Sequence, residues 1–312
     1  MAKELEGLIY KSTGSWYIAK DEAGQLWNLR IKGRFKVDKD ISSTNPIAVG
    51  DRVTFEVEDE ATNTGTISAI TDRHNYIVRV SPHNRHQKHI VASNLDAAMV
   101  MATIREPRTS NGFIDRFLIT AEAYHIPAIV VINKIDVLKP KDQDQLAHWQ
   151  DMYRDAGYEV YAISTLLPET IEILKARLHN ITTLFSGHSG VGKSTLINLL
   201  IPGKDLVTQE VSGYSGKGQH TTTFAEMFDL PGGGRIIDTP GVKEFGLIDF
   251  EKEELAQYFP EMRRVMSGCK FNNCLHVNEP GCAVKDAVNN GVITIDRYAS
   301  YLTILDTIEK KW

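Results

Sequence analysis

The sequence predicts a multidomain protein with an N-terminal β-barrel, a central α/β domain and a C-terminal helical domain that binds a metal ion. Residues 1 to about 70 hold short runs rich in aromatic and β-branched residues, with glycines between them. From about residue 95, apolar strand-like runs alternate with helix-like segments, a pattern typical of a mostly parallel sheet with helices on both faces. Near the C-terminus, three cysteines and a histidine lie close together in the chain.

The bulk composition limits the class of protein. A chain of 312 residues suits two or three domains better than a single core. No apolar run is long enough to span a membrane, and the first residues lack the apolar region of a secretory signal. We therefore expect a cytoplasmic protein without a membrane segment. The net charge of -5 argues against a general coat for nucleic acid, although a local basic surface remains open.

The expected elements follow from the spacing of apolar residues and glycines. Barrel strands are expected at 8–10, 15–19, 25–31 and 52–57. In the α/β domain, strands are expected at 95–104, 128–133, 160–164, 182–186, 224–230 and 235–238, and helices at 113–125, 141–157, 168–180 and 193–200. Two C-terminal amphipathic helices are expected, at 249–266 with Leu255, Phe259 and Met262 on one face, and at 293–311 with Tyr298, Leu302 and Leu305.

One segment fits the phosphate-binding loop G-x-x-x-x-G-K-[ST] in full. It consists of Gly187, His188, Ser189, Gly190, Val191, Gly192, Lys193 and Ser194, and Thr195 follows it. A predicted strand precedes the loop and a predicted helix follows it, which is the context that the motif requires. Lys193 would reach the β- and γ-phosphates, and Ser194 would ligate Mg²⁺. The alternative is a glycine-rich turn that matches by chance.

Two segments after this loop have the pattern of nucleotide switches. Asp238-Thr-Pro-Gly241 ends a predicted strand, where Asp238 would be linked to Mg²⁺ and the Gly241 N–H would contact the γ-phosphate. Three threonines at 221–223 could supply a Mg²⁺ ligand when GTP is bound, and we take Thr222 as that ligand. Threonine also favours strands, so the same run is consistent with the start of a strand.

Asn133, Lys134, Ile135 and Asp136 follow an apolar strand and match the N-K-x-D guanine-recognition motif. The Asp136 carboxylate can accept hydrogen bonds from guanine N1–H and its 2-amino group, whereas adenine offers neither donor. Asn133 would orient the loop and touch the base, and the Lys134 stem would cover the ring face. After the next strand, Ser164 would lend its backbone N–H to guanine O6.

These two guanine-binding segments normally follow the phosphate-binding loop in a GTPase, but here they precede it. A circular permutation explains the order without loss of geometry, because the termini of a domain often lie close together. The sequence therefore predicts a circularly permuted GTPase that binds GTP and GDP and hydrolyses GTP.

Cys269, Cys274, His276 and Cys282 lie within fourteen residues. Three thiolates and one imidazole favour tetrahedral Zn²⁺, and four protein ligands would make the ion structural. Iron is possible in principle. The alternative, three free core cysteines beside a surface histidine, does not explain such tight clustering.

Taken together, the permuted order, the Gly-Gln-His-Thr-Thr-Thr run at 218–223, Asp-Thr-Pro-Gly-Val at 238–242 and the cysteine–histidine cluster resemble the RsgA/YjeQ family. These are bacterial GTPases of small ribosomal subunit biogenesis. The resemblance covers nearly the whole chain. It implies an OB-fold at 1–72, a permuted GTPase domain at 73–248 and a helical zinc-binding domain at 249–312. One mild departure is Thr165, where the family often has Ala; the expected contact there is through backbone.

The resemblance also implies late maturation of the 30S subunit, contact with its 16S rRNA and stimulation of the GTPase by that subunit. We expect a monomer. Either of the two basic segments, at 30–36 and 73–89, could by itself be solvated surface, but together, beside a barrel and a GTPase domain, they favour contact with RNA.

Val242 stands where Ras-like GTPases carry a water-positioning glutamine, so another side chain must position the water. His220, beside the threonine run, is our candidate, although a solvent-facing histidine fits as well. Two rival functions remain open. One is an RNA-binding module that uses GTP only as a structural ligand. The other is a different permuted ribosomal GTPase, which would leave the barrel and the cysteine cluster unexplained.

Overall fold

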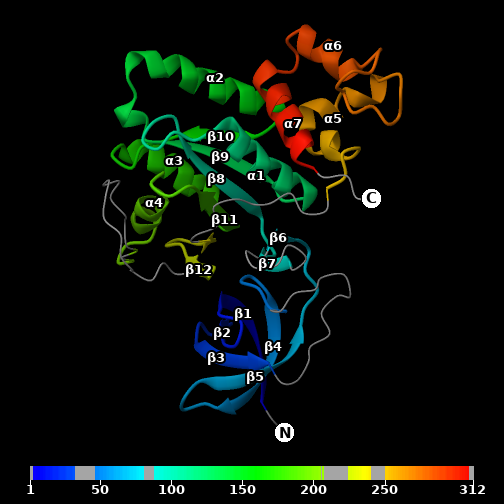
Figure 1. Ribbon diagram of the computed structural model, residues 1–312. Coiled ribbons are helices and arrows are strands. Elements are labelled where there is room, and N and C mark those ends of the chain that lie inside the picture. The colour runs from blue at the N-terminus through cyan, green and yellow to red at the C-terminus, as the bar shows by residue number, and fades with distance from the viewer. Residues whose placement is uncertain are drawn as a thin grey trace, which may run out of the picture.

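The computed structural model describes residues 3–31, 46–80, 88–204, 206, 224–239 and 250–308. The strands are β1 (Glu4–Ser12), β2 (Tyr17–Asp21), β3 (Leu26–Ile31), β4 (Arg52–Asp59), β5 (Thr64–Ile70), β6 (Tyr76–Val80), β7 (Lys88–Ser93), β8 (Ala97–Thr103), β9 (Ala128–Asn133), β10 (Glu159–Ala162), β11 (Thr182–Gly187), β12 (Glu226–Asp229) and β13 (Arg235–Asp238). The α-helices are α1 (Asn111–Ala123), α2 (Pro140–Ala156), α3 (Pro168–Leu178), α4 (Lys193–Leu200), α5 (Pro260–Arg263), α6 (Ala283–Asn289) and α7 (Ile295–Thr307). Figure 1 shows the barrel at one end of the molecule and the C-terminal helices at the other.

The N-terminal strands form the predicted barrel. They follow the order β1-β2-β3-β5-β4, and an additional pairing of β1 with β4 closes the ring. Alternation along β3 places Trp27 and Leu29 in the barrel core and leaves Leu26, Asn28 and Arg30 exposed. The four predicted strands are present, whereas β5 was not predicted because its sequence, Thr-Gly-Thr-Ile-Ser-Ala-Ile, has few large apolar residues.

The central sheet has the order β10-β9-β8-β11-β13-β12. Its first five strands are parallel and β12 is antiparallel to β13, which confirms a mostly parallel sheet. All seven residues of β8 are buried, as expected for a strand covered on both faces. Each predicted strand is present, most with ends shifted by one or two residues. At the far side of β12, a pairing of Glu226 with Lys11 joins this sheet to β1 of the barrel.

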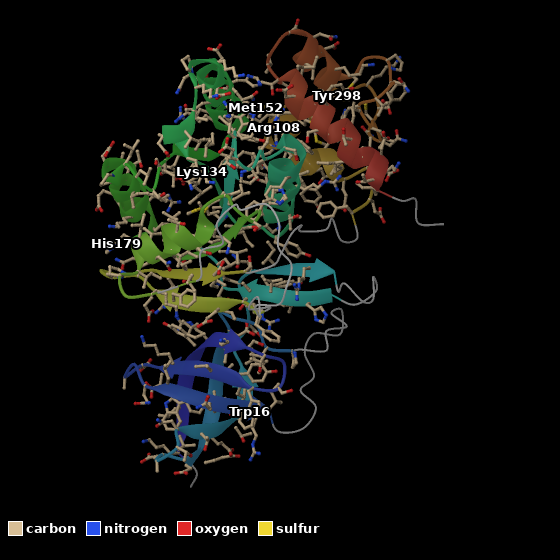
Figure 2. All side chains as sticks on the ribbon, turned by 60° about the vertical axis from the view of Figure 1, so that its left-hand side comes forward. Trp16, Arg108, Lys134, Met152, His179 and Tyr298 are labelled. Atoms are coloured by element: carbon tan, nitrogen blue, oxygen red, sulfur yellow. The ribbon has the colours of Figure 1, made fainter. Side chains whose placement is uncertain are left out.

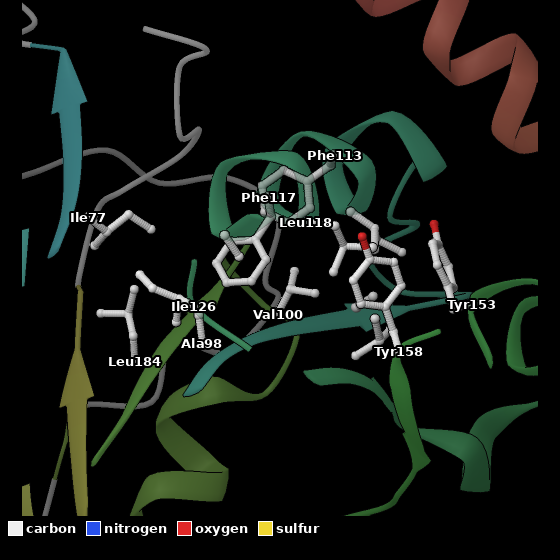
Figure 3. Close-up of a cluster of buried hydrophobic side chains, with 14 of the residues drawn as sticks. Ile77, Ala98, Val100, Phe113, Phe117, Leu118, Ile126, Tyr153, Tyr158 and Leu184 are labelled. Carbon is white, nitrogen blue, oxygen red and sulfur yellow. The ribbon is translucent and has the colours of Figure 1, made fainter. Parts of the chain in front are cut away.

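Helices cover both faces of the central sheet, as predicted. Figure 3 shows Phe113, Phe117 and Leu118 of α1 packed over Ala98 and Val100 of β8. Trp149, Met152 and Tyr153 of α2 join the same cluster. On the opposite face, α3 and α4 contribute Ile171, Leu174, Leu178, Leu196, Ile197 and Leu200 to a second cluster. None of the helices in the described part of the chain combines the length and the apolar character that a membrane span requires.

The predicted long helix at 249–266 is wrong. The described part of that segment forms a short 3-10 turn at Leu255–Tyr258, then α5, and then a second 3-10 turn at Met266–Gly268. Pro260 has no N–H to donate and its ring clashes with the preceding turn, so a helix must begin again there. The predicted apolar face is nevertheless buried, since Leu255, Phe259 and Met262 are fully enclosed. Helix α6, which directly follows Cys282, was not predicted. Helix α7 lies inside the helix that was predicted at 293–311.

Part of the predicted RNA-binding surface has an internal role instead. Arg73 forms a two-pronged ion pair with the buried Asp51, at 2.7 and 2.6 Å, which fixes the segment after the barrel to the barrel itself. Interpreting Arg73 as a solvent-facing basic residue is therefore wrong. Arg30 lies on the barrel surface, 3.1 Å from Glu58. Residues 32–36 and 81–87 of the two basic segments lie outside the described residues.

Candidate nucleotide site and metal cluster

The phosphate-binding loop joins β11 to α4 at the carboxyl edge of the sheet. β11 ends at Gly187 and α4 begins at Lys193. Between them, Gly190 and Gly192 have φ angles of 84° and 95°, in the left-handed region that favours glycine. A Cβ on Gly192 would also collide with Asn133 Nδ2. The backbone thus has the strand–turn–helix path by which such loops present N–H groups to phosphate.

The guanine-recognition motif lies beside this loop although 58 residues separate the two contact points in the chain. Asn133 ends β9 and is almost completely buried. Its Nδ2 donates a 2.8 Å hydrogen bond to the Val191 carbonyl of the phosphate-binding loop. The sheet order, with β8 alone between β9 and β11, is what brings the two strand ends together. The two predicted motifs therefore lie next to each other at the same edge of the sheet.

The Asp136 carboxylate is held by a side chain that sequence reasoning assigned differently. The buried Ser164 hydroxyl donates to Asp136 Oδ1, and it accepts a 3.0 Å hydrogen bond from the Leu166 N–H. Ser164 was expected to act through its backbone. Its side chain has a further role, because it orients the carboxylate that would read guanine. The Ser-Thr-Leu-Leu loop after β10 carried no sequence signal for this contact.

Lys134 is anchored on the loop that follows β8. Its backbone adopts a left-handed conformation with φ of 62°, and its Nζ donates a 2.6 Å hydrogen bond to the Glu106 carbonyl. That loop is braced by the Thr109 hydroxyl, which accepts from the Thr103 N–H at 3.0 Å. In Figure 2, Lys134 and Arg108 mark this edge of the sheet. The contact of Lys134 with Glu106 was not predicted, because it is made by a backbone carbonyl and does not depend on the type of residue at position 106.

Lys193 forms an ion pair with Asp238, the last residue of β13. Both side chains are about nine-tenths buried. The neighbouring Thr239 hydroxyl donates to the Phe185 carbonyl of β11 at 3.0 Å, which holds the strand ends together. The start of the Asp-Thr-Pro-Gly segment therefore lies against the phosphate-binding loop. His220, Thr222, Gly241 and Val242 lie outside the described residues, as does the whole threonine run.

Cys269, Cys274, His276 and Cys282 converge on one point, and their ligand atoms all lie within 4.8 Å of one another. His276 Nδ1 lies 3.3 Å from Cys282 Sγ and 3.6 Å from Cys269 Sγ, so Nδ1 is the ring nitrogen that faces the sulfurs. Three sulfurs and one nitrogen at this spacing fit a tetrahedral zinc ion. Four protein donors would leave no open coordination position for water or substrate, which suits a structural ion.

Burial shifts the pKa of Cys274 and of His276 in this cluster, in each case toward the neutral form. Burial raises the pKa of the Cys274 thiol to about 12, and the neighbouring Cys282 adds to the effect. Burial also lowers the pKa of His276, which keeps the imidazole neutral and able to donate its lone pair to a metal. A bound cation would supply the charge that turns these thiols into thiolate ligands.

The loop that carries the cluster is held from two sides. The Glu279 carboxylate accepts hydrogen bonds from the N–H groups of Leu275, Val277 and Asn278 at 2.8 to 3.0 Å. From α7, the Tyr298 hydroxyl donates to the His276 carbonyl at 2.6 Å. These contacts set the left-handed backbone at His276, whose φ is 59°.

Comparisons with known proteins agree with this arrangement. Family models match twice: the RsgA N-terminal domain over residues 6–67 and the RsgA GTPase over residues 70–248. The chain is 52% identical to the small ribosomal subunit biogenesis GTPase RsgA of Flavobacterium psychrophilum, over 97% of this chain and 93% of that protein. It is 49% identical to the protein of the same name from Bacteroides fragilis, with 98% of each chain covered.

Solved structures show the same architecture. YjeQ from Thermotoga maritima matches with a TM-score of 0.78 and 30% identity, over 97% of this chain and 98% of that one. YloQ, described as a circularly permuted GTPase, matches with a TM-score of 0.75 and 30% identity, over 99% and 98% of the two chains. The fold, the permuted order and the shared length all agree, and this chain belongs to the RsgA GTPase family.

Proposed function

We propose that this protein hydrolyses GTP in the maturation of the small ribosomal subunit, and that it binds this subunit while doing so. The observation that carries the proposal is the hydrogen bond from Asn133 to the Val191 carbonyl, because it unites the guanine reader and the phosphate-binding loop in one site. The curated relatives are named for small ribosomal subunit biogenesis over almost their full length.

Within this site, each residue has a proposed role. Asp136, held by Ser164, reads guanine N1–H and the 2-amino group. Lys193 and the N–H groups of 187–194 neutralise phosphate charge as it develops. The γ-phosphate would draw Lys193 from its pairing with Asp238, which links nucleotide state to the segment after β13. His220 and Thr222 keep the roles that the sequence suggested, water positioning and metal ligation.

Two metal ions belong to the proposal. Ser194 and Asp238 provide the hard oxygen donors that suit Mg²⁺, which would shield the phosphate charges of bound GTP. Cys269, Cys274, His276 and Cys282 would hold one zinc ion that stabilises the C-terminal fold. The proposed domains remain 1–72, 73–248 and 249–312. The proposed partner surface includes 16S rRNA, and the proposed setting is the cytoplasm, with the protein acting as a monomer.

Steady-state phosphate release tests the function. We expect slow release by the free protein and faster release with 30S subunits, because a partner that prefers the ordered switch state raises its population. Lys193→Ala should abolish the stimulated rate, whereas Lys175→Ala, a surface lysine paired with Glu172, should leave it unchanged. Equal rates with 30S, with 50S and with neither would reject the proposal. GTP binding without any phosphate release would favour an RNA-binding module that uses GTP structurally.

A further inference from the structure

Helix α1 is shared between the nucleotide site and the C-terminal helices. One side of it packs on the sheet through Phe113, Ile114, Phe117, Leu118 and Ala121. A second side faces the C-terminal helices through Asp115, Ile119 and Glu122, which follow the i, i+4, i+7 spacing of one helical stripe. Ile119 is enclosed in the C-terminal apolar cluster, and Glu122 pairs with Arg263 of α5 at 3.0 Å.

The centre of this second contact is a buried ion cluster. Arg297 of α7 donates to Asp115 of α1 and to Glu261 of α5, the latter through Nε at 2.7 Å. All three side chains are at least nine-tenths buried. The rings of Tyr153 and Phe259 lie over the guanidinium at 5.7 and 4.7 Å.

Such a cluster selects one docking geometry. A buried ion pair contributes little net stability compared with apolar packing, but it strongly disfavours arrangements that leave a charge without its partner. Any rotation of α7 away from α1 would separate Arg297 from Asp115 in an apolar surrounding. Helix α1 and the C-terminal helices are therefore expected to move together.

The first turn of the same helix touches the phosphate-binding loop. The ring of Phe113 of α1 lies against that of His188, the residue after Gly187, with centroids 3.6 Å apart and the planes tilted by 31°. The Ser110 hydroxyl caps the helix by accepting from the Phe113 N–H at 3.3 Å, which fixes the position of that residue. Phe113 and Asp115 are two positions apart on the helix, less than one turn.

We propose that α1 is a positioning element through which the C-terminal helices set nucleotide affinity: Asp115–Arg297 fixes the helix, and Phe113 transmits its position to His188 in the phosphate-binding loop. None of Phe113, Asp115 and Arg297 needs to touch nucleotide for this. The inference rests on the proposed GTP site and adds a residue pair that tunes it. Since coupling between two sites is reciprocal, nucleotide should also stabilise α7.

The test measures both directions of the coupling. GDP affinity is measured with a fluorescent GDP analogue, and hydrogen–deuterium exchange of α7 peptides is followed with and without GDP. In the wild type we expect GDP to slow exchange in α7. Phe113→Leu, which keeps apolar bulk but removes the ring from His188, should weaken GDP binding by about tenfold and remove the response of α7, within the usual range of allosteric coupling.

Asp115→Asn keeps the side-chain shape but removes one charge from the cluster, and we expect it to weaken GDP binding in the same way. Combining it with Phe113→Leu should add little further loss, because both changes break one chain of contacts. The matched control is Asp296→Asn. Asp296 of α7 contacts His148 of α2 at 2.7 Å on the surface. This contact also links α7 to the central α/β domain, but it does so without α1. This variant should keep wild-type affinity and the wild-type response of α7.

The outcomes are distinguishable. Normal GDP binding with no change of α7 exchange in the wild type would overturn the coupling while leaving the proposed GTPase function intact. Absence of GDP binding by the wild type would reject the function itself. If circular dichroism shows that Asp115→Asn does not fold, Phe113→Leu decides alone: an unchanged α7 response in that variant contradicts the inference, and a lost response supports it.

Discussion

The nucleotide site and the metal cluster are built in opposite ways. The nucleotide site gathers residues from the ends of β9, β11 and β13, which lie far apart in the chain, and an apolar sheet core positions them. The metal cluster takes its four ligands from fourteen consecutive residues between two short helices. The first site is fixed by the fold around it, whereas we expect the second to depend on a bound metal ion for its fold.

The apolar surroundings explain this contrast. Phe185 and Leu184 of β11 and Val130 and Ile132 of β9 are fully buried, so both strand ends are held by the core. The metal-binding loop lies between Met266–Gly268 and α6, where hydrogen bonds with Glu279, Tyr298 and Tyr301 hold it against the smaller C-terminal apolar cluster. Metal removal and point substitutions should therefore affect the two sites differently.

The largest expected effect comes from removing one of the proposed zinc ligands. Cys274→Ser should lower zinc content and destabilise the C-terminal helices by several kcal/mol, since a structural zinc contributes about 10 kcal/mol or more of binding free energy to folding. Elemental analysis and limited proteolysis would measure this. Asn278→Ala, an exposed residue in the same loop, is the control. Full resistance to proteolysis in a metal-free wild type would contradict a structural ion.

Asn133→Ala should have the next largest effect. It removes the hydrogen bond to the Val191 carbonyl and leaves a buried acceptor without its donor, which costs about 1–3 kcal/mol. We expect weaker GDP binding and a lower melting temperature together, because one side chain serves both the base reader and the phosphate-binding loop. Calorimetric titration and thermal unfolding would measure the two losses. Retention of wild-type values in both would show that the bridge between the motifs is dispensable.

Ser164→Ala should have a smaller and purely local effect. Loss of one hydroxyl donor to Asp136 should weaken GTP binding by about 1 kcal/mol, roughly fivefold, with little change in melting temperature. Thr165→Ala provides the control in the next residue, and it should bind GTP as the wild type does. Equal losses in both variants would point to general damage to the loop after β10.

The smallest effect concerns a surface ion pair between Glu159 of β10 and Arg177 of α3. Hydrogen bonds from Arg177, at 2.7 Å, lower the pKa of Glu159 below its ordinary 4.5. A lowered carboxyl pKa adds stability above about pH 4.5 that is lost as the pH falls through the lowered value. Arg177→Gln should therefore destabilise by about 0.5 kcal/mol at pH 7 and by less at pH 3. Urea unfolding at the two pH values would detect the difference, and an equal loss at both would exclude the charge as its cause.

Much of this molecule could be predicted from the sequence because the strong signals are local. The apolar run Ala128–Asn133 has the predicted bounds, since a buried parallel strand needs a continuous apolar segment. The convergence of the four candidate metal ligands could be predicted because their residue types and spacing are themselves the signal. The prediction of one helix at 249–266 is wrong because it gave more weight to the apolar periodicity than to the single proline at 260.

The contacts between distant segments could not be predicted in the same way. The roles of Glu106, Ser164 and Arg297 depend on which strand or helix lies beside them, and that is decided by sheet order and packing. Arg73 was assigned to a solvent-facing basic surface because nothing in the sequence links it to Asp51. Charge counts along the chain cannot distinguish a buried pair from an exposed one.

The most direct test of the nucleotide site is a change of base specificity. Asn at position 136 would present a donor where guanine also has donors, whereas xanthine carries an acceptor in place of the 2-amino group. We therefore predict that Asp136→Asn loses GTP hydrolysis and gains hydrolysis of xanthosine triphosphate, with ATP inactive on both proteins. The measurement is phosphate release with each nucleotide, with and without 30S subunits. Loss of GTP hydrolysis without any gain for xanthosine triphosphate, or equal use of ATP and GTP by the wild type, would contradict Asp136 as the guanine reader.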